Sequence, residues 1–232
     1  MTSGFLLTGQ PVILFLTFLW NPKRMQNNRL RLLSAITCTA LALVLAPRAD
    51  AQSYKVEADK PDFDDLKSPE FGGGNNKKFK PKEWLEIEAS FKVQMSPEPP
   101  SKTAERVLVK WYVAVEHPDK KGAYLLLTKD ITYVNVELNE ELFTSVYLSP
   151  ASVKRITGSD RAGKNSVYLV GYEILINGEK VAQETSKSKP GWWNKASDKI
   201  SRSETVPLLD KSETPFAHMW WDRYAEILKE RR

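Results

Sequence analysis

The chain has 232 residues, and its 34 Lys and Arg against 29 Asp and Glu give a formal net charge of +5. Residues 1–51 carry five of these bases and one of the acids, which leaves 29 bases and 28 acids for 52–232. The chain after residue 51 therefore lacks the positive surplus typical of nucleic-acid-binding proteins. The single cysteine, Cys38, also lies in the N-terminal segment, so disulfides, thiolate metal sites and cysteine nucleophiles are excluded beyond it.

From Met25 onward the sequence has the three parts of a secretory signal peptide. Arg29 precedes an apolar stretch over 32–46, and the small residues Ala49 and Ala51 follow. Signal peptidase accepts small side chains at these two positions, so we expect cleavage after Ala51 and export from the cytoplasm. The mature protein would then lie in the periplasm, on the outer-membrane surface or outside the cell.

Residues 1–24 are expected to be an upstream extension, with Met25 as the true start of translation. A second apolar stretch over 5–20 is interrupted by Gly9, Gln10 and Pro11. The uninterrupted part is shorter than the roughly 20 residues that a membrane-spanning helix needs. The alternative hypothesis retains 1–24 as a membrane anchor.

Residues 52–82 are charged and carry proline and a glycine run, with almost no apolar periodicity. This composition predicts an extended leader or linker ahead of the folded domain. A half-buried strand begins immediately afterwards, because apolar residues alternate with polar ones over 84–94. The same alternation over 107–116 predicts a second core strand, with Trp111 at its centre.

The rest of 83–190 reads as further short strands joined by turns. Asn177-Gly178 is a strong hairpin signal, while Ser149, Pro150 and Gly158 predict the cap, first turn and stop of one short helix. Five further strands are expected over 124–128, 131–138, 142–148, 167–176 and 180–185. About seven closely spaced strands predict an all-β protein, an immunoglobulin-like antiparallel β-sandwich over 83–190, with a small closed barrel as the alternative.

The C-terminal extension, 191–232, is expected to end in a helix that packs on the sandwich. Thr214-Pro215 suits a helix start, and Phe216, Trp220, Tyr224 and Ile227 recur at helical spacing.

No set of residues predicts an enzyme, a cofactor or a metal site. Gly158–Asn165 resembles a phosphate-binding loop but leads into a strand, and Asn165 stands where a metal-binding hydroxyl is required. His117 and His218 are the only histidines, which leaves no second histidine near either for zinc. The acidic residues Asp59, Asp62, Asp64 and Asp65 lack the spacing of a calcium loop. The carboxylate pairs Glu86 with Glu88 and Glu140 with Glu141 could in principle cleave a glycoside, but Glu86 and Glu88 are read as the solvated face of an alternating strand.

Two adjacent tryptophan pairs, Trp192-Trp193 and Trp220-Trp221, are the candidate contact residues for a partner or a glycan. Side chains of neighbouring residues leave the backbone in different directions, so one indole of each pair could be packed while the other is exposed. An exposed indole can stack on a sugar ring or anchor a protein partner. The alternative is that the tail folds back and all four rings seal an edge of the sandwich.

Several segments together resemble the verrucomicrobial pilus-like proteins of the Akkermansia type, a family encoded beside type IV pilus components. They are Phe79–Ile87, Trp111-Tyr112, Tyr147–Pro150 and Thr214–Tyr224. The resemblance implies an immunoglobulin-like fold related to archaeal pilus subunits, an envelope location and no enzymatic activity. A conventional type IV pilin keeps a long apolar helix, which cleavage after Ala51 would remove here, so we expect an accessory, adhesive or strand-donating role.

The leading hypothesis is therefore a non-enzymatic exported envelope protein, a pilus-associated structural or adhesion component with protein partners. Residues 52–82 are its candidate donated strand or tether. The alternative is a secreted carbohydrate-binding module that uses its exposed tryptophans on host glycans. A third hypothesis, a glycosidase, would depend on Glu140 or Glu141.

Overall fold

Alternating apolar and polar residues form strands along much of the described part of the chain. The computed structural model describes residues 52–70, 80–159 and 163–229, which belong to one compact unit, Ala51–Arg232. The longer strands are β3 (Glu83–Ser96), β4 (Thr103–Glu116), β5 (Tyr124–Glu137), β6 (Glu141–Leu148), β7 (Val167–Ile176) and β8 (Glu179–Thr185). The shorter ones are β1 (Ser53–Ala58), β2 (Asp62–Lys67), β9 (Ile200–Arg202), β10 (Leu209–Asp210) and β11 (Glu226–Ile227). The helical elements are α2 (Pro150–Thr157) and the single 3₁₀ turns η2 (Lys164–Ser166), η3 (Trp192–Asn194), η4 (Lys211–Glu213) and η5 (Trp221–Arg223).

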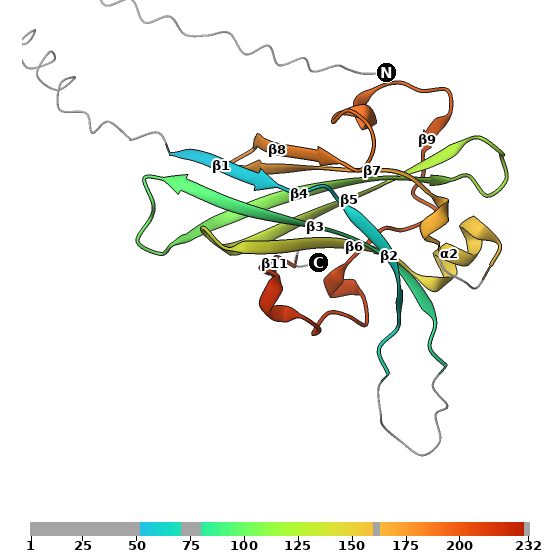
Figure 1. Cartoon of the computed structure of the whole chain (residues 1–232), viewed down its shortest axis with the longest axis horizontal. Helices are drawn as coiled ribbons and strands as arrows, with labels where there is room; N and C mark the ends of the chain where they lie inside the picture. Colours follow the sequence, from blue (N-terminus) through green and yellow to red (C-terminus); the bar gives the residue numbers. More distant parts are fainter. Residues whose placement is uncertain (1–51, 71–79, 160–162, 230–232) are drawn as a thin grey trace, which may run out of the picture. The chain divides into compact units, whose positions relative to one another are not determined.

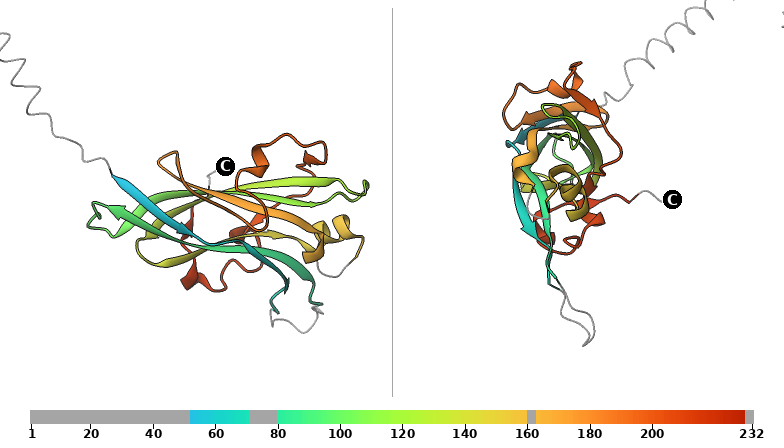
Figure 2. Two further views of the ribbon diagram at one scale, coloured as in Figure 1. Left: turned by 45° about the horizontal axis from the view of Figure 1, so that its top comes forward. Right: turned by 90° about the vertical axis from the view of Figure 1, so that its right-hand side faces the viewer.

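The strands form two sheets that face each other (Figures 1 and 2). Sheet A has the order β1-β3-β6-β10, and β2 joins it by pairing with β3. Sheet B has the order β11-β5-β4-β7-β8, and β9 pairs with β5. All named strand pairs are antiparallel except β5 with β9. The prediction of an all-β protein is confirmed.

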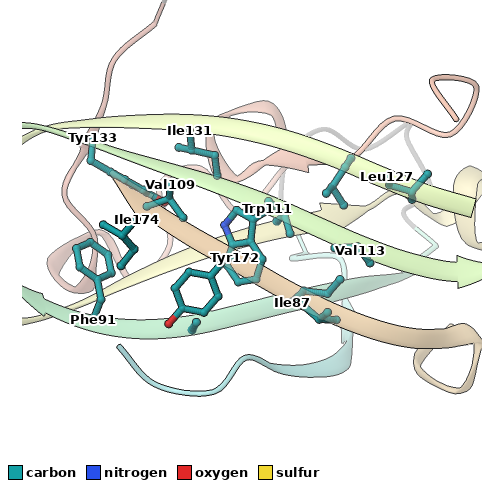
Figure 3. Close-up of a cluster of buried hydrophobic side chains, with 14 of the residues drawn as sticks. Ile87, Phe91, Val109, Trp111, Val113, Leu127, Ile131, Tyr133, Tyr172 and Ile174 are labelled. Carbon is teal, nitrogen blue, oxygen red and sulfur yellow. The ribbon is translucent and has the colours of Figure 1, made fainter. Parts of the chain in front are cut away.

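The inner faces of the two sheets share one core, which Figure 3 shows around Trp111. The alternation read from the sequence places the core residues correctly, since the inward side chains of β3 and β4 are almost fully buried. The indole N–H of Trp111 donates to Thr144 Oγ1 at 3.1 Å, and the hydroxyl of Tyr133 donates to the same oxygen at 3.0 Å. This polar contact within the core satisfies both aromatic donors.

Two local predictions are confirmed. Ser149 caps α2 by accepting from the Ser152 N–H, Pro150 opens the helix, and Gly158 ends it with a left-handed φ of 69°. Asn177 and Gly178 both have positive φ, at 53° and 81°, and join β7 to β8. Tight hairpin turns need this conformation at both central residues, which Asn and Gly adopt at low cost.

The range 52–82, expected to be a leader or linker, contributes two strands to sheet A. β1 pairs with residues 91–96 of β3, and β2 pairs with residues 83–88 on the same edge. The inward side chains of β1 and β2, among them Tyr54, Val56 and Phe63, pack against the core. Their alternation is short and diluted by charged residues, which is why the segment reads as a linker. The strands predicted over 124–128 and 131–138 form one continuous strand, β5.

The prediction of a C-terminal helix is wrong. In the described part of the tail, 191–229, the chain forms 3₁₀ turns and short strands instead. Residues near 192–200 cover the outer face of sheet B, and residues 211–224 cover the outer face of sheet A. The tail therefore gives each sheet a second layer, drawn in orange and red in Figures 1 and 2.

Candidate functional site

The outer face of sheet A carries acidic and aromatic side chains instead of the solvated surface that the sequence suggested. Glu86 and Glu88 lie on β3, opposite Tyr147 and Ser145 of β6. Tyr147 donates to Glu86 Oε1 at 2.6 Å, and Ser145 donates to the Tyr147 hydroxyl at 3.1 Å. Burial raises the pKa of Glu86, despite the opposing hydrogen bond from Tyr147. The expectation that Glu86 and Glu88 belong to a solvated surface is wrong, because residues 211–224 cover them.

Tyr224 and Arg223 attach this covering segment to the sheet, and Lys211 joins parts of the segment to one another. Lys211 is only 3% exposed, donates to the Met219 carbonyl, and has its ammonium 3.9 Å from the centre of the Tyr224 ring. Tyr224 in turn donates to Glu88 Oε1, and Arg223 lies 3.5 Å from Glu88 Oε2. Burial lowers the pKa of Lys211 and raises that of Tyr224.

An aromatic cluster fixes the middle of the segment. Phe216 is almost fully buried and packs edge-on against Trp84, with ring centroids 5.8 Å apart. It also stacks on Tyr147 at 5.5 Å and on Trp220 at 6.4 Å. Phe216 thus joins the tail to both β3 and β6. The sequence identified it as a packing residue but assigned it to a helix.

The backbone turns sharply between the two tryptophans of the second pair. Trp220 has φ 51° and ψ 35°, a left-handed conformation that bulky residues seldom adopt. Its ring stacks on Phe216 and is 39% exposed, whereas Trp221 is 75% exposed. The turn therefore holds one indole against the tail's own aromatic cluster and leaves its neighbour open to solvent.

Trp221 lines an open pocket of about 620 Å³ between the tail and the ends of β4, β5 and β6. The side chains around it combine exposed acids and bases with small apolar surfaces. The lining is Thr103, Asn135, Glu137, Leu142, Lys211, Ser212, Ala217, His218, Trp221, Asp222, Tyr224, Ala225, Glu226, Ile227 and Lys229. This volume lies within the range of roughly 300 to 1,000 Å³ of small-molecule sites. The pocket with Trp221 is the candidate binding site of the described chain.

The first tryptophan pair is packed inside the protein. Trp192 is 7% exposed and donates to Thr185 Oγ1 at 3.2 Å. Trp193 is 4% exposed, stacks on Tyr112 at 4.8 Å, and lies directly over Gly171, which has no side chain to obstruct it. Because both indoles are buried against sheet B, neither presents a ring face to a glycan or partner. This pair therefore fits the alternative hypothesis, in which the tail folds back onto the sandwich. The two rings cover the outer face of sheet B and not an edge.

The loop that resembled a phosphate site already binds a carboxylate of the chain. The N–H groups of Gly163 and Lys164 donate to Asp65 Oδ1 at 2.9 and 3.2 Å, and the Lys164 ammonium lies 2.9 Å from Asp64 Oδ1. This part of the loop leads through η2 into β7 and not into a helix. Its two amides are therefore paired with β2, and residues 160–162 lie outside the described residues.

The other polar candidates are scattered. Asp59 accepts from Ser90 at 2.6 Å, His117 Nδ1 accepts from the Asp119 N–H at 3.1 Å, and Glu140 and Glu141 are exposed at the start of β6. Over 52–70, 80–159 and 163–229, no three or more His, Cys, Asp or Glu residues gather where they could hold a metal ion.

The predicted signal-peptidase residues, Ala49 and Ala51, lie outside the described residues. Within the described ranges, none of the helices has the length and apolar character needed to cross a bilayer.

Comparison with known proteins finds a matching family model and a similar solved structure. A family model matches residues 47–231, which is most of the chain. A crystal structure of a protein from Akkermansia muciniphila is 38% identical and superimposes with a TM-score of 0.72. The similarity covers 80% of this chain and 97% of that one. None of the curated proteins matches.

Proposed function

Because the chain belongs to the Akkermansia-type family of pilus-like proteins, we propose that it is an exported structural protein of the cell envelope with no catalytic role. Its working partners are other proteins of a pilus-like assembly. The proposal includes an immunoglobulin-like sandwich, supported by the two facing sheets and by the buried Trp111 of β4. Export is supported by the signal-peptide pattern before Gln52.

The observation that carries the proposal is the position of β1. This strand begins one residue after the expected mature N-terminus and forms part of an edge of sheet A, where β3 is its paired neighbour. Its inward side chains Tyr54, Val56 and Ala58 are half-buried against the core. A terminal edge strand with an apolar face can be exchanged between subunits, since an identical strand from a neighbour would make the same contacts.

The residue after β1 provides a fixed pivot for such an exchange. The Asp59 N–H donates to the Ser90 carbonyl at 3.0 Å, and the Asp59 carbonyl accepts from Tyr172 at 2.6 Å. The following Pro61 is buried, and β2 pairs with β3 independently. β1 could therefore leave its place while the rest of sheet A stays intact. The vacated edge of β3 would present unpaired backbone groups over residues 91–96 to an incoming strand.

A disulfide lock tests this role of β1. Lys55 and Gln94 are direct partners across β1 and β3, and the mature chain has no cysteine of its own. In mature K55C/Q94C, oxidation after assembly should give covalent oligomers, because β1 of one copy would lie beside β3 of another. Oxidation of dilute monomer should lock β1 in place and prevent assembly until a reductant is added. Non-reducing gels and light scattering measure both results.

The matched control places a cysteine pair in sheet B, away from β1, at the paired positions Lys110 and Asp130 of β4 and β5. That lock should leave assembly unchanged. Assembly of the β1-locked protein at the rate of the unlocked protein would contradict strand exchange, as would covalent monomers alone after oxidation of the assembled material.

A further inference from the structure

We propose that the pocket beside Trp221 binds a 2-acetamido sugar within an oligosaccharide chain. This inference goes beyond the structural role above and does not depend on strand exchange. Its starting point is the geometry at Trp220, where a left-handed turn separates the two indoles and leaves Trp221 exposed. Unfavourable backbone conformations of this kind persist where the surrounding contacts impose them, and they are concentrated at functional sites.

The exposed ring is supported by a rigid base. Its neighbours Trp220 and Arg223 are held by the Phe216 stack and by the contact with Glu88. Arg223 also lies over the Phe143 ring, with its guanidinium carbon 3.7 Å from the ring centre. Because the backbone on both sides of Trp221 is held by these contacts, a ligand that stacks on the ring restricts only the side-chain rotation, which favours binding.

The chemistry around Trp221 favours a sugar over an apolar protein anchor. Glu137, Asp222 and Glu226 are exposed and bring carboxylates to the pocket, while Lys229 and His218 add potential donors. An apolar anchor would take these groups out of water without replacing their hydrogen bonds, which is costly. Sugar hydroxyls can form such bonds, and the C–H face of the ring can stack on the indole.

Small apolar surfaces in the pocket indicate the acetamido group. Leu142, Ala217, Ala225 and Ile227 also line it, and all but the buried Leu142 are half-buried. Together they offer a patch that suits a methyl group close to the polar rim. An N-acetylhexosamine combines this methyl with hydroxyls and a stacking face, whereas an unsubstituted hexose lacks the methyl. The bacterial cell wall and mucin-type glycans both contain such sugars.

The experiment titrates the mature protein with three probes. N,N′-diacetylchitobiose represents cell-wall glycan, an N-acetylgalactosamine-containing core disaccharide represents mucin, and cellobiose is the analogue without acetamido groups. Binding is measured by calorimetry and by the NMR shift of the Trp221 indole N–H. We expect at least one acetamido probe to bind about tenfold more tightly than cellobiose, a difference of about 1.4 kcal/mol. Whichever acetamido probe binds more tightly shows whether the natural ligand is cell-wall glycan or mucin-type glycan.

Trp221→Ala should weaken binding of that probe at least about tenfold, and Trp221→Tyr should restore part of it. The control is Tyr168→Ala, which removes an aromatic side chain that is 43% exposed and stacks on Tyr124, outside the pocket. It should bind as the wild type does. The proposal is overturned if neither acetamido probe binds, if cellobiose binds equally well, or if Trp221→Ala binds unchanged. The proposal is also overturned if the NMR signal of the Trp221 indole N–H shifts only as the concentration of the protein itself is raised and not with any sugar. The pocket would then be a contact between copies of the protein.

Discussion

Glu86 is a carboxyl group held where its neutral form is favoured. The side chains that face it are Tyr147 from β6, Glu88 from β3, and Lys211 and Arg223 from the tail. Burial raises its pKa above the ordinary value of 4.5, so the folded state binds more protons than the unfolded state just above that pH. The contribution of Glu86 to stability is therefore fully present below pH 4.5 and declines as pH rises through the folded-state pKa.

Glu86→Gln should remove this pH dependence. The amide oxygen still accepts from Tyr147, but the side chain can no longer ionise. We expect the free energy of unfolding of the variant to increase relative to that of the wild type between pH 4.5 and 7. Urea denaturation followed by tryptophan fluorescence at several pH values measures the difference. Glu98→Gln, at an exposed loop position, is the control and should show no such trend. A pH-dependent role of Glu86 is contradicted if the free energy of unfolding of Glu86→Gln differs from that of the wild type by the same amount at every pH.

Gly171 leaves the space that the Trp193 ring occupies on sheet B. A Cβ at this position would lie 2.2 Å from the ring carbon Cζ3 of Trp193, closer than packed atoms can approach. Gly171→Ala should therefore displace the indole from Tyr112 and destabilise the protein by about 1 to 3 kcal/mol, the usual effect of overpacking. Chemical denaturation measures this change in the free energy of unfolding.

A double-mutant cycle tests the cause. In a Trp193→Ala background the obstructing ring is absent, so Gly171→Ala should have little further effect. The same loss in both backgrounds would show that the strand itself, and not contact with Trp193, requires glycine.

At the scale of elements, the buried ring of Phe216 connects the covering segment 211–224 to both β3 and β6. Phe216→Ala removes contacts with Trp84, Tyr147 and Trp220 and should cost about 3 kcal/mol or more. Loosening the segment would also expose the two peptide bonds that trypsin recognises after Lys211 and Arg223. We expect early cleavage at these sites, identified by mass spectrometry of short digests.

The control for this prediction is Leu228→Ala, further along the tail, where the side chain is already 41% exposed. Its cleavage pattern should match the wild type. Resistance of Phe216→Ala to trypsin at both sites would mean that the contacts of Tyr224 and Arg223 with Glu88 hold the segment without the aromatic cluster.

The elements that could be predicted from the sequence are those whose signals are local. Alternation marked β3 and β4, Asn177-Gly178 marked the hairpin, and Ser149 with Gly158 marked both ends of α2. Each of these signals acts within a few residues, so no distant contact is needed to read it.

The structure of the tail could not be predicted from such local signals. Phe216, Trp220, Tyr224 and Ile227 share a helical spacing, but each is fixed by a different partner: Trp84, Phe216, Glu88 and, through β11, the backbone of β5. Tertiary contacts therefore override the periodicity. The pairing of Glu86 and Glu88 with the tail was missed for the same reason, since alternation indicates which face is inward but not what covers the outward one.

At the scale of the whole molecule, the tail determines which surfaces remain for the proposed assembly. Trp192 and Trp193 cover part of the outer face of sheet B, and 211–224 cover part of that of sheet A. The sheet edges are therefore the natural places for backbone pairing with another subunit. β1 and β8 form edges of their respective sheets and lie close together, and Asn177 in the turn before β8 donates to the Tyr54 hydroxyl of β1 at 2.8 Å. Exchange of β1 would use the side of the molecule that the tail leaves open.

The position of the covering segment in the chain also constrains biogenesis. Residues 211–224 are synthesised more than a hundred residues after Trp84 and Glu86, which they cover. A nascent chain cannot complete this packing before residue 224 has been made. Until then the chain stays incompletely folded, which is the state that the proposed export through a translocation channel requires.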